Sequence, residues 1–477
     1  MSNSPVTLDQ LAAVGAGRVV GDGSVRIVDV THDSRAAGPD DLFVAVRGEK
    51  VDGHDFVDTA TAAAVCVEES VSTTIPQLVV ADTRAALPLL AAEVHGHPSR
   101  HMQVVGITGT NGKTTVAHLV AAIVEAAGEV AGVVGTVGAR IGAEQLPLER
   151  TSPEASDFQR LLRKMVDAGV RTAAVEVSSH AVVYGRTAAT DFAVVAFTNL
   201  SQDHLDFHGD METYFAAKAS LFAKTTGIAV INTDDEWGKR LADMVAMPFL
   251  RVGTDGDFSA EELATGLAES TFQLRTPEGS YPVRLPMGGR FNVENALMAA
   301  ACTHAAGYSA ESIASGLSSA APAPGRMEAV VVEDGPLVIV DYAHTPNGIE
   351  QVLQSVAPLV DGRVIVVVGA GGDRDAAKRP EMGRAASQAD LLFITSDNPR
   401  SEDPEVIIAA VAAGADGPAE VRIIEDRRRA IAEAMHTGEI GDAILILGKG
   451  HELGQEIAGV VHPFDDRAVA RDVAGVR

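Results

Sequence analysis

The chain has 477 residues, of which 46% are hydrophobic and 22% are charged, so it can bury large cores and is not disordered throughout. At about 150 residues per domain, this length predicts roughly three domains. Lys and Arg number 38 against 65 Asp and Glu, which gives a formal net charge of -27. A chain this acidic binds nucleic acid or an anionic membrane poorly, so we expect neither partner.

The cysteine content points to a reducing compartment. Cys66 and Cys302 are the only cysteines, too few for a disulfide framework or a Cys-based zinc site. We therefore expect a cytoplasmic protein. We expect no secretory signal, because the first residues lack a basic start followed by an apolar run, and no membrane span, because no apolar stretch is long enough.

The predicted elements, taken in chain order, divide the sequence into three regions. Residues 1–100 carry short apolar strands and Ala-rich helical runs, and a linker around Pro98 follows them. Residues 101–325 alternate buried strands with helices up to a Pro-rich hinge, and residues 326–477 repeat that alternation. The strands we predict lie at 41–46, 77–81, 103–108, 172–177, 192–197, 227–231, 337–340, 364–368, 391–395 and 443–447.

This alternation predicts an α/β fold with parallel sheets in the second and third regions. In both regions the polar motifs follow directly after the strands. Ligands of open α/β sheets bind at the carboxyl ends of the strands. We therefore expect one cleft, lined by loops from both regions.

A Gly-rich loop, Gly106 to Thr115, lies between the strand at 103–108 and a helix predicted from Thr114 to Ala127. Its glycines let backbone N–H groups surround phosphate oxygens, and the helix adds its N-terminal dipole. The spacing G-x-x-G-x-x-G-K-T-T departs from the usual P-loop, which has a glycine where this chain has Ile107. We assign ATP binding to Gly109, Thr110, Asn111, Gly112, Lys113, Thr114 and Thr115. Lys113 is expected at the β- and γ-phosphates and the Thr114 hydroxyl at Mg²⁺.

Two polar motifs after later strands are candidates to complete a metal site. Glu176 ends an apolar strand, and its carboxylate suits Mg²⁺. His204 follows another strand, but histidine is an unusual Mg²⁺ ligand, so its residue type alone favours a structural role. Lys218 lies in a predicted helix, where a solvent-exposed side chain is the simplest interpretation.

The combined motif set resembles the Mur ligase family, ATP-dependent enzymes that form the amide bonds of the peptidoglycan stem peptide, over nearly the whole chain. The Gly-rich loop is shared with folylpolyglutamate synthetases, whereas other motifs are narrower. These are Glu176 to His180, Thr198 to Asp206, Phe291 to Asn295, Gly325 to Glu328 and Asp341 to Pro346. Within the family they are most similar to the type that adds the third residue to UDP-N-acetylmuramoyl-L-alanyl-D-glutamate.

One motif resembles the signature of the diaminopimelate-adding type: Asp397, Asn398, Pro399 and Arg400. Diaminopimelate carries an extra carboxylate and ammonium at its far end, and the Arg400 guanidinium is a bidentate partner for that carboxylate. Asp397 and Asn398 would accept from an ammonium or fix the loop. The resemblance adds Gly448, Glu452 for the distal ammonium, and Arg374 for a second carboxylate.

The resemblance also implies roles for residues that spacing alone does not assign. Asn295 matches the residue near adenine, Arg326 the cation toward the phosphates, and Asp341 the ribose contact. Lys218 matches a lysine that CO₂ carbamylates, so the resemblance implies that Thr114, Glu176, His204 and the Lys218 carbamate hold two Mg²⁺ ions. The catalytic set is then Lys113, Glu176, His204 and Lys218. The UDP-substrate set is Ser34, Thr151, Ser152, Ser178 and Arg186, with Tyr184 standing where relatives can have Gln.

We therefore expect three α/β domains: residues 1–100 recognising the UDP-muramoyl substrate, 101–325 forming a central P-loop ATPase-like parallel sheet, and 326–477 forming a Rossmann-like domain for the amino acid. The expected protein is a monomeric ligase of small-molecule substrates that adds meso-diaminopimelate through an acyl phosphate. His204 and His344 are both candidates for the general base. Three alternatives stay open: the same ligase specific for L-lysine, a folylpolyglutamate synthetase, and an ATP-dependent binding protein that ligates nothing.

Overall fold

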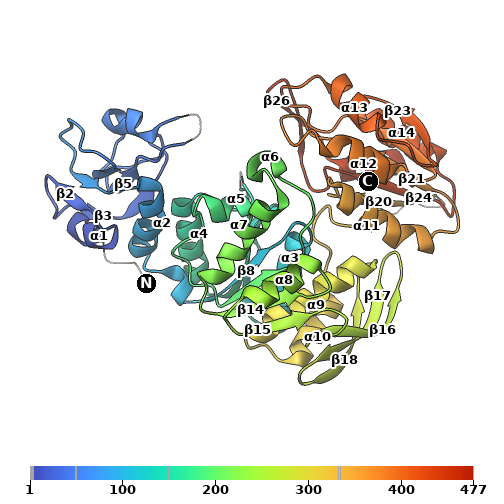
Figure 1. The fold of residues 1–477 in the computed structure, drawn as a ribbon, viewed down its shortest axis with the longest axis horizontal. Helices are drawn as coiled ribbons and strands as arrows, with labels where there is room; N and C mark the ends of the chain where they lie inside the picture. Colours follow the sequence, from blue (N-terminus) through green and yellow to red (C-terminus); the bar gives the residue numbers. More distant parts are fainter. Residues whose placement is uncertain (1–4, 49–50, 149, 331, 333–334, 476–477) are drawn as a thin grey trace.

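The computed structural model describes residues 5–48, 51–148, 150–330, 332 and 335–475. It has three lobes, each built on its own sheet, arranged in chain order from the blue N-terminal lobe to the red C-terminal lobe (Figure 1). The α/β fold class is confirmed. The predicted boundaries near 100 and 325 fall in connections between these sheets, and their role as domain boundaries stays a prediction.

The N-terminal lobe has a five-stranded sheet in the order β2-β7-β6-β5-β4, in which the four strands from β4 to β7 are parallel and β2 is antiparallel. Its apolar strand residues pack against two helices on one face. Its elements are β1 Val6–Thr7, α1 Leu8–Val14, β2 Arg18–Val20, β3 Arg26–Ile27, β4 Asp29–Thr31, β5 Asp41–Val44, η1 Gly53–Thr59, β6 Ala64–Val67, β7 Gln77–Val79 and α2 Thr83–Val94.

The central lobe has an eight-stranded sheet in the order β11-β10-β9-β12-β8-β13-β14-β15. Six of its strands are parallel, whereas β10 and β11 form an antiparallel edge that the sequence analysis did not predict. The elements are η2 Pro98–Arg100, β8 Gln103–Thr108, α3 Lys113–Ala126, β9 Val130–Gly135, β10 Gly138–Ile141, β11 Glu144–Leu146, α4 Ala155–Asp167, β12 Val170–Glu176, α5 Ser179–Val183, β13 Val194–Phe197, α6 Leu205–His208, α7 Met211–Ala223, β14 Ile228–Asn232, α8 Glu236–Met244 and β15 Phe249–Val252.

Helices cover both faces of the central sheet, as β8 illustrates. Val105 and Ile107 of β8 belong to the core that contains α3, whereas Val104 belongs to the opposite core with α4 and α7. Alternate residues of one strand point to opposite faces, so a strand covered on both sides is apolar throughout. The first core extends into an added layer: β16 Ser259–Thr265, β17 Ser270–Thr276, β18 Gly279–Leu285, α9 Arg290–Ala305 and α10 Ala310–Ser319.

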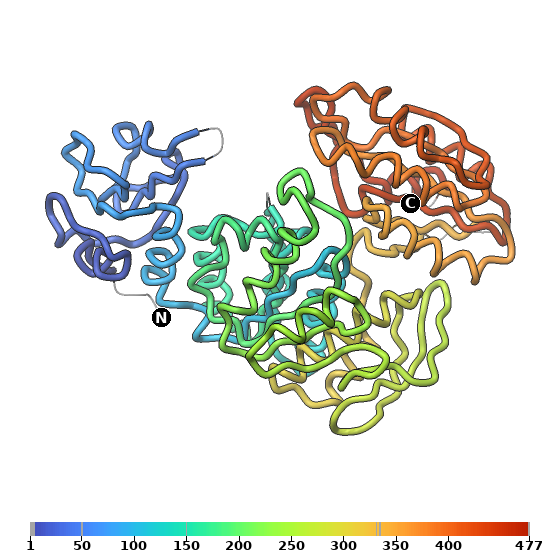
Figure 2. The backbone as a smooth tube through the Cα atoms, in the orientation of Figure 1, coloured from blue at the N-terminus to red at the C-terminus, as the bar shows by residue number. Residues whose placement is uncertain are grey.

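The C-terminal lobe has a six-stranded Rossmann-like sheet in the order β19-β20-β24-β21-β22-β23, parallel except for β19. One passage of chain after α10 leads into it (Figure 2). Its elements are β19 Glu328–Val330, β20 Leu337–Asp341, α11 Pro346–Val356, η3 Ala357–Leu359, β21 Val364–Val368, α12 Lys378–Ala386, β22 Leu391–Ile394, α13 Pro404–Ala412, β23 Glu420–Ile423, α14 Arg427–Thr437, β24 Ala443–Leu447, β25 Gly454–Ile457, β26 Val460–Pro463 and α15 Asp466–Ala474.

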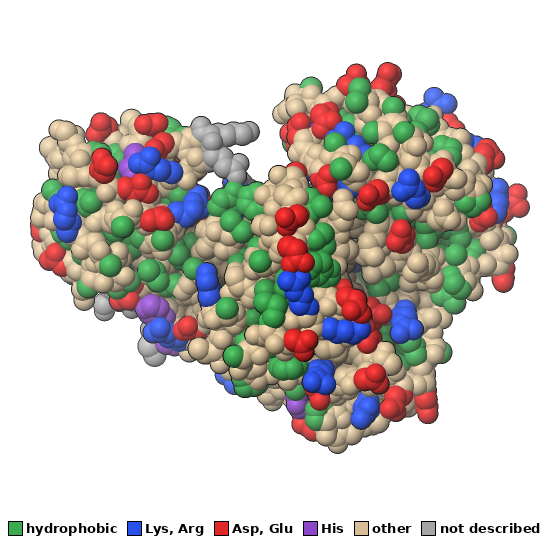
Figure 3. All heavy atoms as spheres, viewed as in Figure 1, with side chains coloured by type: hydrophobic (Ala, Val, Ile, Leu, Met, Phe, Trp, Pro, Cys, Tyr) green, Lys and Arg blue, Asp and Glu red, His purple; other side chains and the backbone are tan. Residues whose placement is uncertain are grey.

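The outer lobes stand apart above the central lobe. The space-filling view shows a wide notch between them (Figure 3). Within the described ranges, none of the helices has the length and apolar character needed to cross a membrane. The predicted polar motifs lie at the carboxyl ends of strands in two sheets. These strands are β8, β12 and β13 of the central sheet and β20, β22 and β24 of the C-terminal sheet.

Candidate active site

The Gly-rich loop joins β8 to α3 in a conformation that only glycine adopts easily. Gly109 and Gly112 have φ of 144° and 87°. A Cβ on Gly109 would stand 1.9 Å from Thr198 Oγ1, and a Cβ on Gly112 would stand 2.2 Å from Asn295 Oδ1. The two glycines therefore let two other segments approach the loop, and one of them carries Asn295, the predicted adenine-side residue.

The motif after β13 holds this loop in place by hydrogen bonds. Asn199 accepts from Thr110 N through its backbone oxygen and from Asn111 N through Oδ1, both at 2.9 Å. Thr198 Oγ1 donates to Asn111 O at 2.6 Å. The sequence analysis identified this motif but assigned a role only to His204 in it. The signal for Asn199 and Thr198 was their place directly after a buried strand, beside the Gly-rich loop's own strand in the sheet.

The N-terminus of α3 is open toward the loop, because its N-cap Gly112 supplies no side-chain hydrogen bond. Lys113 Nζ donates to Gly109 O at 2.9 Å and to Thr110 O at 2.8 Å. Burial lowers the pKa of Lys113, partly opposed by the charge of Glu176. Free backbone donors, a helix dipole and a lysine gathered at one strand end form an anion-binding site.

Glu176, at the end of β12, is held beside this loop. It accepts from Thr136 N at 3.0 Å and from Thr136 Oγ1 at 3.1 Å. Thr136 Oγ1 lies 3.2 Å from Thr151 Oγ1, and Ser152 Oγ donates to Glu176 O at 2.9 Å. The structure therefore groups the predicted Glu176, Thr151 and Ser152 through Thr136, a residue that the sequence analysis did not single out.

Lys218 does not occupy the exposed position that its sequence context alone favoured. It is 1% exposed on α7, donates from Nζ to Gly109 O at 2.9 Å, and lies 4.6 Å from the Tyr214 ring centroid. Burial, followed by the charge of Lys113, holds its pKa well below the usual lysine value. The interpretation as a solvated helix lysine is therefore wrong.

Several histidines lie close to Lys218. The rings of His180 and His204 are 5.0 Å apart, and those of His208 and Tyr214 are 4.9 Å apart. Burial lowers the pKa of His204 to about 3, against the opposing charge of Asp203, whose carboxylate lies 3.3 Å from its ring. His204 is therefore neutral at pH 7, and its backbone φ of 55° places it in a region that non-glycine residues seldom adopt.

Two contacts join the C-terminal lobe to the phosphate loop: Asn111 Nδ2 donates to Asn347 Oδ1 of α11 at 3.2 Å, and Arg326 donates to Thr114. Arg326 Nη2 donates to Thr114 Oγ1 at 3.1 Å, its guanidinium lies 4.6 Å from the Tyr342 ring centroid, and its buried Nε has no hydrogen-bond partner among the described residues. Asp341 accepts from Met327 N and Ala343 N, each at 2.8 Å, and burial raises its pKa. A partly buried guanidinium whose Nε donor is unused, next to the loop, suits an anionic ligand.

A third bridge was missed by sequence reasoning. Lys378 Nζ lies 3.4 Å from Asp203 Oδ1, so the first residue of α12 meets the motif after β13. His344 is close to both, and burial together with the Lys378 charge lowers its pKa to about 4. His204 and His344, the two candidate bases, therefore face the same Asp203–Lys378 pair from opposite lobes.

Arg186, one of the predicted UDP-substrate residues, lies at the junction of the N-terminal and central lobes. Arg186 Nε donates to Glu154 at 2.9 Å, Glu154 also accepts from Arg84 of α2 at 3.3 Å, and the Tyr184 ring lies 5.3 Å from both guanidinium carbons. The Ser178 hydroxyl caps α5. Ser34 is half-buried in the N-terminal lobe, and no hydrogen bond between described residues joins it to Arg186.

The predicted amino-acid loop follows β22 and crosses the strand ends. Arg400 has φ of 54°, and its Nη1 donates to Gly372 O at 2.5 Å. A Cβ on Gly371 would lie 3.1 Å from Arg400 Nη1 and 3.9 Å from Arg374 Cγ, so the two arginines flank that glycine. Residues held in sparsely populated backbone regions cluster at functional sites, which supports a binding role for Arg400.

The remaining members of this set are joined by buried contacts. Asn398 Nδ2 donates to Glu452 Oε2 at 2.7 Å, and a Cβ on Gly448 would lie 2.7 Å from Asp397 Oδ2. Lys449, which was not assigned a role, donates to both Asn398 and Glu452. The structure therefore brings together Asp397, Asn398, Gly448 and Glu452, with Arg400 and Arg374 on the side of the loop facing Gly371.

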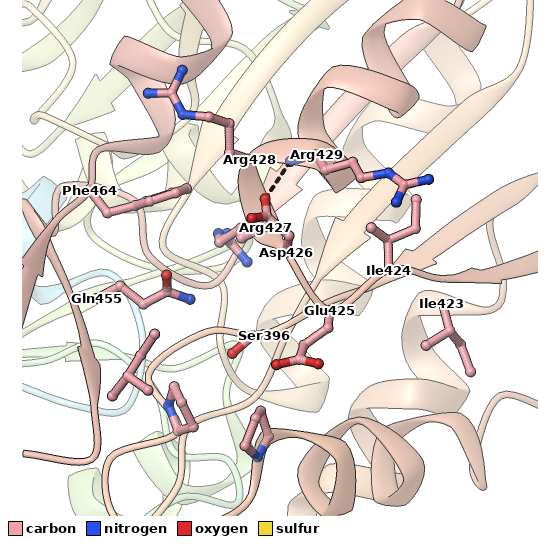
Figure 4. A pocket seen from close by; sticks show the side chains of 13 residues that line it. Ser396, Ile423, Ile424, Glu425, Asp426, Arg427, Arg428, Arg429, Gln455 and Phe464 are labelled. Atoms are coloured by element: carbon pink, nitrogen blue, oxygen red, sulfur yellow. Dashed lines mark hydrogen bonds between the residues drawn. The ribbon is translucent and has the colours of Figure 1, made fainter.

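A cavity of about 740 Å³ lies on the other side of this loop. Ser396 and Pro399 line it, but Asp397 and Asn398 between them do not. Figure 4 shows Gln455, Phe464 and Arg427 around it, with Asp426 accepting from Arg429 N. Arg427 Nη1 has no hydrogen-bond partner among the described residues, but it has no exposed surface that a ligand could touch. The cavity therefore lies on the face of the loop opposite to Asp397 and Asn398.

No group of three His, Cys, Asp or Glu side chains is placed to hold a metal ion in the parts of the chain that are described. Mg²⁺ bound with a nucleotide needs only one or two protein oxygen ligands, because phosphates and water supply the rest. The Thr114 hydroxyl and the Glu176 carboxylate beside Lys113 meet that requirement. The donor set fits Mg²⁺ bound together with phosphate.

The parallel sheet, the Gly-rich loop and the cations around it define a P-loop nucleotide-binding protein whose C-terminal Rossmann-like lobe completes the site. Comparison with known proteins identifies its family. The Mur ligase middle domain matches residues 107–303, the glutamate ligase domain of Mur ligases matches 325–450, and the Mur ligase family catalytic domain matches 26–95. The chain belongs to the Mur ligase family.

Its relatives include two named UDP-N-acetylmuramoyl-L-alanyl-D-glutamate--2,6-diaminopimelate ligase. That of Streptomyces coelicolor is 44% identical, with 94% of this chain and 93% of the relative covered. That of Geobacillus thermodenitrificans is 43% identical, with 94% and 95% covered. A solved structure of a ligase of the same name is 31% identical, covers 99% of both chains and has a TM-score of 0.69. MurF from Acinetobacter baumannii is 22% identical with a TM-score of 0.73, which shows the shared fold.

Proposed function

We propose that the chain is an ATP-dependent ligase that adds meso-diaminopimelate to UDP-N-acetylmuramoyl-L-alanyl-D-glutamate. The carrying observation is near-full-length similarity, at 43–44% identity, to relatives named for that reaction. The grouping of Asn398, Gly448 and Glu452 beside Arg400 supports it from the structure. We further propose that it works as a cytoplasmic monomer on small molecules and binds neither nucleic acid nor membrane, in keeping with its net charge of -27.

The reaction has two stages. The D-Glu γ-carboxylate attacks the γ-phosphorus of ATP, which gives an acyl phosphate and ADP. The amine of diaminopimelate then attacks the acyl carbon, the amide C–N bond forms, and phosphate leaves. Because both stages bring anions together, catalysis depends chiefly on positioning and on neutralising charge.

The phosphate loop supplies this neutralisation. Lys113 leaves its two loop carbonyls and binds the β- and γ-phosphates, while backbone N–H groups at the uncapped N-terminus of α3 donate to the phosphate oxygens. Arg326 adds its unused Nε from the other lobe. Asn295 lies against the loop for the adenine, and Asp341 accepts from the ribose.

Thr114, Glu176 and His204 would hold Mg²⁺, and Mg²⁺ would neutralise charge on the phosphates. Glu176 is suited to this because Thr136 already orients both of its oxygens. His204 is suited because burial keeps its imidazole neutral, as a metal ligand must be.

Lys218 is proposed to carry a carbamate. Its Nζ attacks the carbon of CO₂, an N–C bond forms, and a proton is lost, which converts a cation into a carboxylate. Only the neutral amine attacks, and burial together with the nearby Lys113 charge favours that form. The resulting carboxylate would lie near the Lys113 charge and would supply an additional oxygen ligand for Mg²⁺.

The incoming ammonium must lose a proton before it attacks. His344 is the better placed of the two candidate bases, because it belongs to the lobe that carries the amino-acid loop, and its pKa of about 4 leaves it neutral at pH 7. His204 is proposed as a metal ligand instead. Arg186, Ser178, Thr151 and Ser152 would contact the muramoyl substrate, and Ser34 the uridine end.

One assay tests the proposal and separates the alternatives. ADP release and ligated product are measured with UDP-N-acetylmuramoyl-L-alanyl-D-glutamate and either meso-diaminopimelate or L-lysine. We expect ligation with diaminopimelate and far slower ligation with lysine. Equal rates would point to a lysine ligase, and product from a folate and glutamate instead would point to a folylpolyglutamate synthetase. ADP release without any ligated product would leave an ATP-hydrolysing binding protein.

A further inference from the structure

Lys449 is a fully buried lysine in the middle of the proposed amino-acid site. It follows Gly448 after β24 and has 0% exposure. Its Nζ donates to Asn398 Oδ1 at 3.1 Å and to Glu452 Oε2 at 3.0 Å, and it lies 3.8 Å from Asp397 Oδ1. All three partners belong to the set proposed to recognise the amino acid, whereas Lys449 itself has no surface that a substrate could touch.

These contacts fix the Asn398 amide in one orientation. Its Oδ1 accepts from Lys449 Nζ and from Glu456 N, the latter at 3.0 Å, while its Nδ2 donates to Glu452 Oε2. An amide turned by 180° would place its NH₂ group against two donors. Lys449 and the Glu456 N–H together determine which end of the amide faces Glu452.

Lys449 also leaves one oxygen of Glu452 free for a ligand. Oε2 accepts from both Lys449 and Asn398, and no hydrogen bond from the described residues reaches Oε1. Burial alone would raise the pKa of Glu452, but the Lys449 charge and hydrogen bond lower it overall, so the carboxylate stays ionised. A partly buried carboxylate with one free oxygen is a partner for an ammonium.

The surrounding charges leave the site short of one cation. Three carboxyl groups, those of Asp397, Glu452 and Asp466, share two nearby cations among the described residues, Lys449 and Arg427, and Asp466 is paired with Arg427 at 2.7 Å. Burial raises the pKa of Asp397, and the charges of Lys449 and Arg427 oppose that rise only in part. A buried charge is stable only when it is paired. An ammonium on the ligand supplies the missing positive charge.

We propose that Lys449 is a positioning residue that sets the site's preference for an amino acid with a distal ammonium, by holding Asn398 and Glu452 in the receiving arrangement. The inference rests on the proposed function. It differs from the roles of Asp397, Asn398 and Glu452, because Lys449 acts only through them. Removal of Lys449 should therefore change amino-acid selectivity and leave the nucleotide side unaffected.

The test compares meso-diaminopimelate with 2-aminopimelate, which keeps both carboxylates and lacks the distal ammonium. The variants are Lys449→Met and, as a surface control, Lys164→Met of α4. In Lys449→Met we expect the kcat/KM preference for diaminopimelate over 2-aminopimelate to fall about 10- to 100-fold, with the KM values for ATP and the UDP-substrate unchanged. Lys164→Met should behave as wild type.

A double mutant keeps the test decisive. Glu452→Gln should lose the same preference, and adding Lys449→Met to it should cause little further loss, because both act through one ammonium contact. The double mutant Lys449→Met, Glu452→Gln also removes one positive and one negative charge, so it remains usable if Lys449→Met alone does not fold. Additive losses, a retained preference in folded Lys449→Met, or equal losses for all three substrates would overturn the inference. Wild-type protein that ligates neither amino acid would instead overturn the proposed function.

Discussion

The phosphate side and the amino-acid side of the site are built in different ways. Around the Gly-rich loop, backbone groups and two glycines create the shape, and the Lys113 ammonium donates to carbonyls of its own loop. Around Asn398, buried side chains create the shape, and the Lys449 ammonium donates to other side chains. The first side offers free donors to an anion, and the second offers an ionised carboxylate to a cation.

This difference suits the two ligands. Every nucleotide carries the same phosphates, and a backbone cradle binds them whatever the rest of the ligand is. The amino-acid site has to discriminate between the correct amino acid and its analogues. Discrimination is large where the wrong ligand leaves a buried polar group of the site unpaired. Variants on the phosphate side should therefore affect catalysis as a whole, whereas variants on the amino-acid side should affect the choice of substrate.

The largest effect is expected for Lys113→Ala. Loss of a cation placed at the reacting phosphates should cost about 3 kcal/mol or more of transition-state stabilisation, a loss of at least about 100-fold in turnover. Turnover is measured with saturating substrates, and Lys164→Ala is the control, because its side chain pairs with Glu144 on the surface. A Lys113→Ala enzyme with wild-type turnover would remove the phosphate-loop assignment.

Lys218→Ala should be nearly inactive for a different reason, since it removes a proposed carboxylate. A short-chain carboxylic acid such as acetate should therefore restore part of its activity, whereas the same acid should not restore Lys113→Ala. Lys224→Ala, in an exposed residue that caps the same helix, is the matched control. Full activity of Lys218→Ala in bicarbonate-depleted buffer would show that no carbamate is needed.

On the amino-acid side, Arg400→Ala should raise the KM for diaminopimelate about 10- to 100-fold, as expected for a lost charge-assisted hydrogen bond. The KM values for ATP and the UDP-substrate should stay within about twofold of wild type, because the contacts of Arg400 lie in its own lobe. Arg400→Lys should not restore affinity, since an ammonium lacks the planar fork. Arg428→Ala, in an exposed arginine of α14, is the control. An unchanged KM for diaminopimelate would contradict the assignment.

Sequence reasoning succeeded where the signal was continuous along the chain. The strands at 364–368 and 443–447 match β21 and β24, because strands buried on both faces are unbroken apolar runs. The helix after the Gly-rich loop begins one residue earlier than predicted, at Lys113. The strands β10 and β11 at the antiparallel edge were not predicted, since β11 is short and polar, and β10, although mostly buried, has only four residues and includes Arg140.

Local motifs also predicted most of the site residues, but they did not predict the contacts that hold those residues in place. The Asp203–Lys378 bridge joins positions 175 residues apart, and Lys449 reaches Asn398 across 51. Such pairs depend on which strand ends become neighbours, and spacing does not reveal that. Lys218 gives the clearest example: its helix context favours solvent, and only the packing of α7 against the loop buries it.

The smallest effect on activity is expected for substitution of Asp29 in the N-terminal lobe, because the charge of Asp29 has a structural role. Arg160 of α4 donates to Asp29 at 2.7 and 3.1 Å, and His95 Nε2 lies 3.1 Å from it. Burial alone would raise the pKa of Asp29, but hydrogen bonds from His95 and Arg160, together with the Arg160 charge, bring it to about 2 from an ordinary value of 3.8. This depressed pKa corresponds to about 2 kcal/mol of stability, present above pH 4 and lost as the pH falls toward 2.

Asp29→Asn should therefore lower the thermal unfolding midpoint at pH 7, and its difference from wild type should shrink as the pH falls below about 4. Asp58→Asn, at an exposed aspartate of the same lobe, is the control and should show no such difference. The KM values for all three substrates should be unchanged, which sets Asp29 apart from Lys113 and from Arg400. A destabilisation that stays constant down to pH 3 would mean that packing, rather than the ionised carboxylate, holds the lobes together. Loss of ligation without loss of stability would mean that this junction belongs to the active site, and the contrast between structural and functional charge would have to be redrawn.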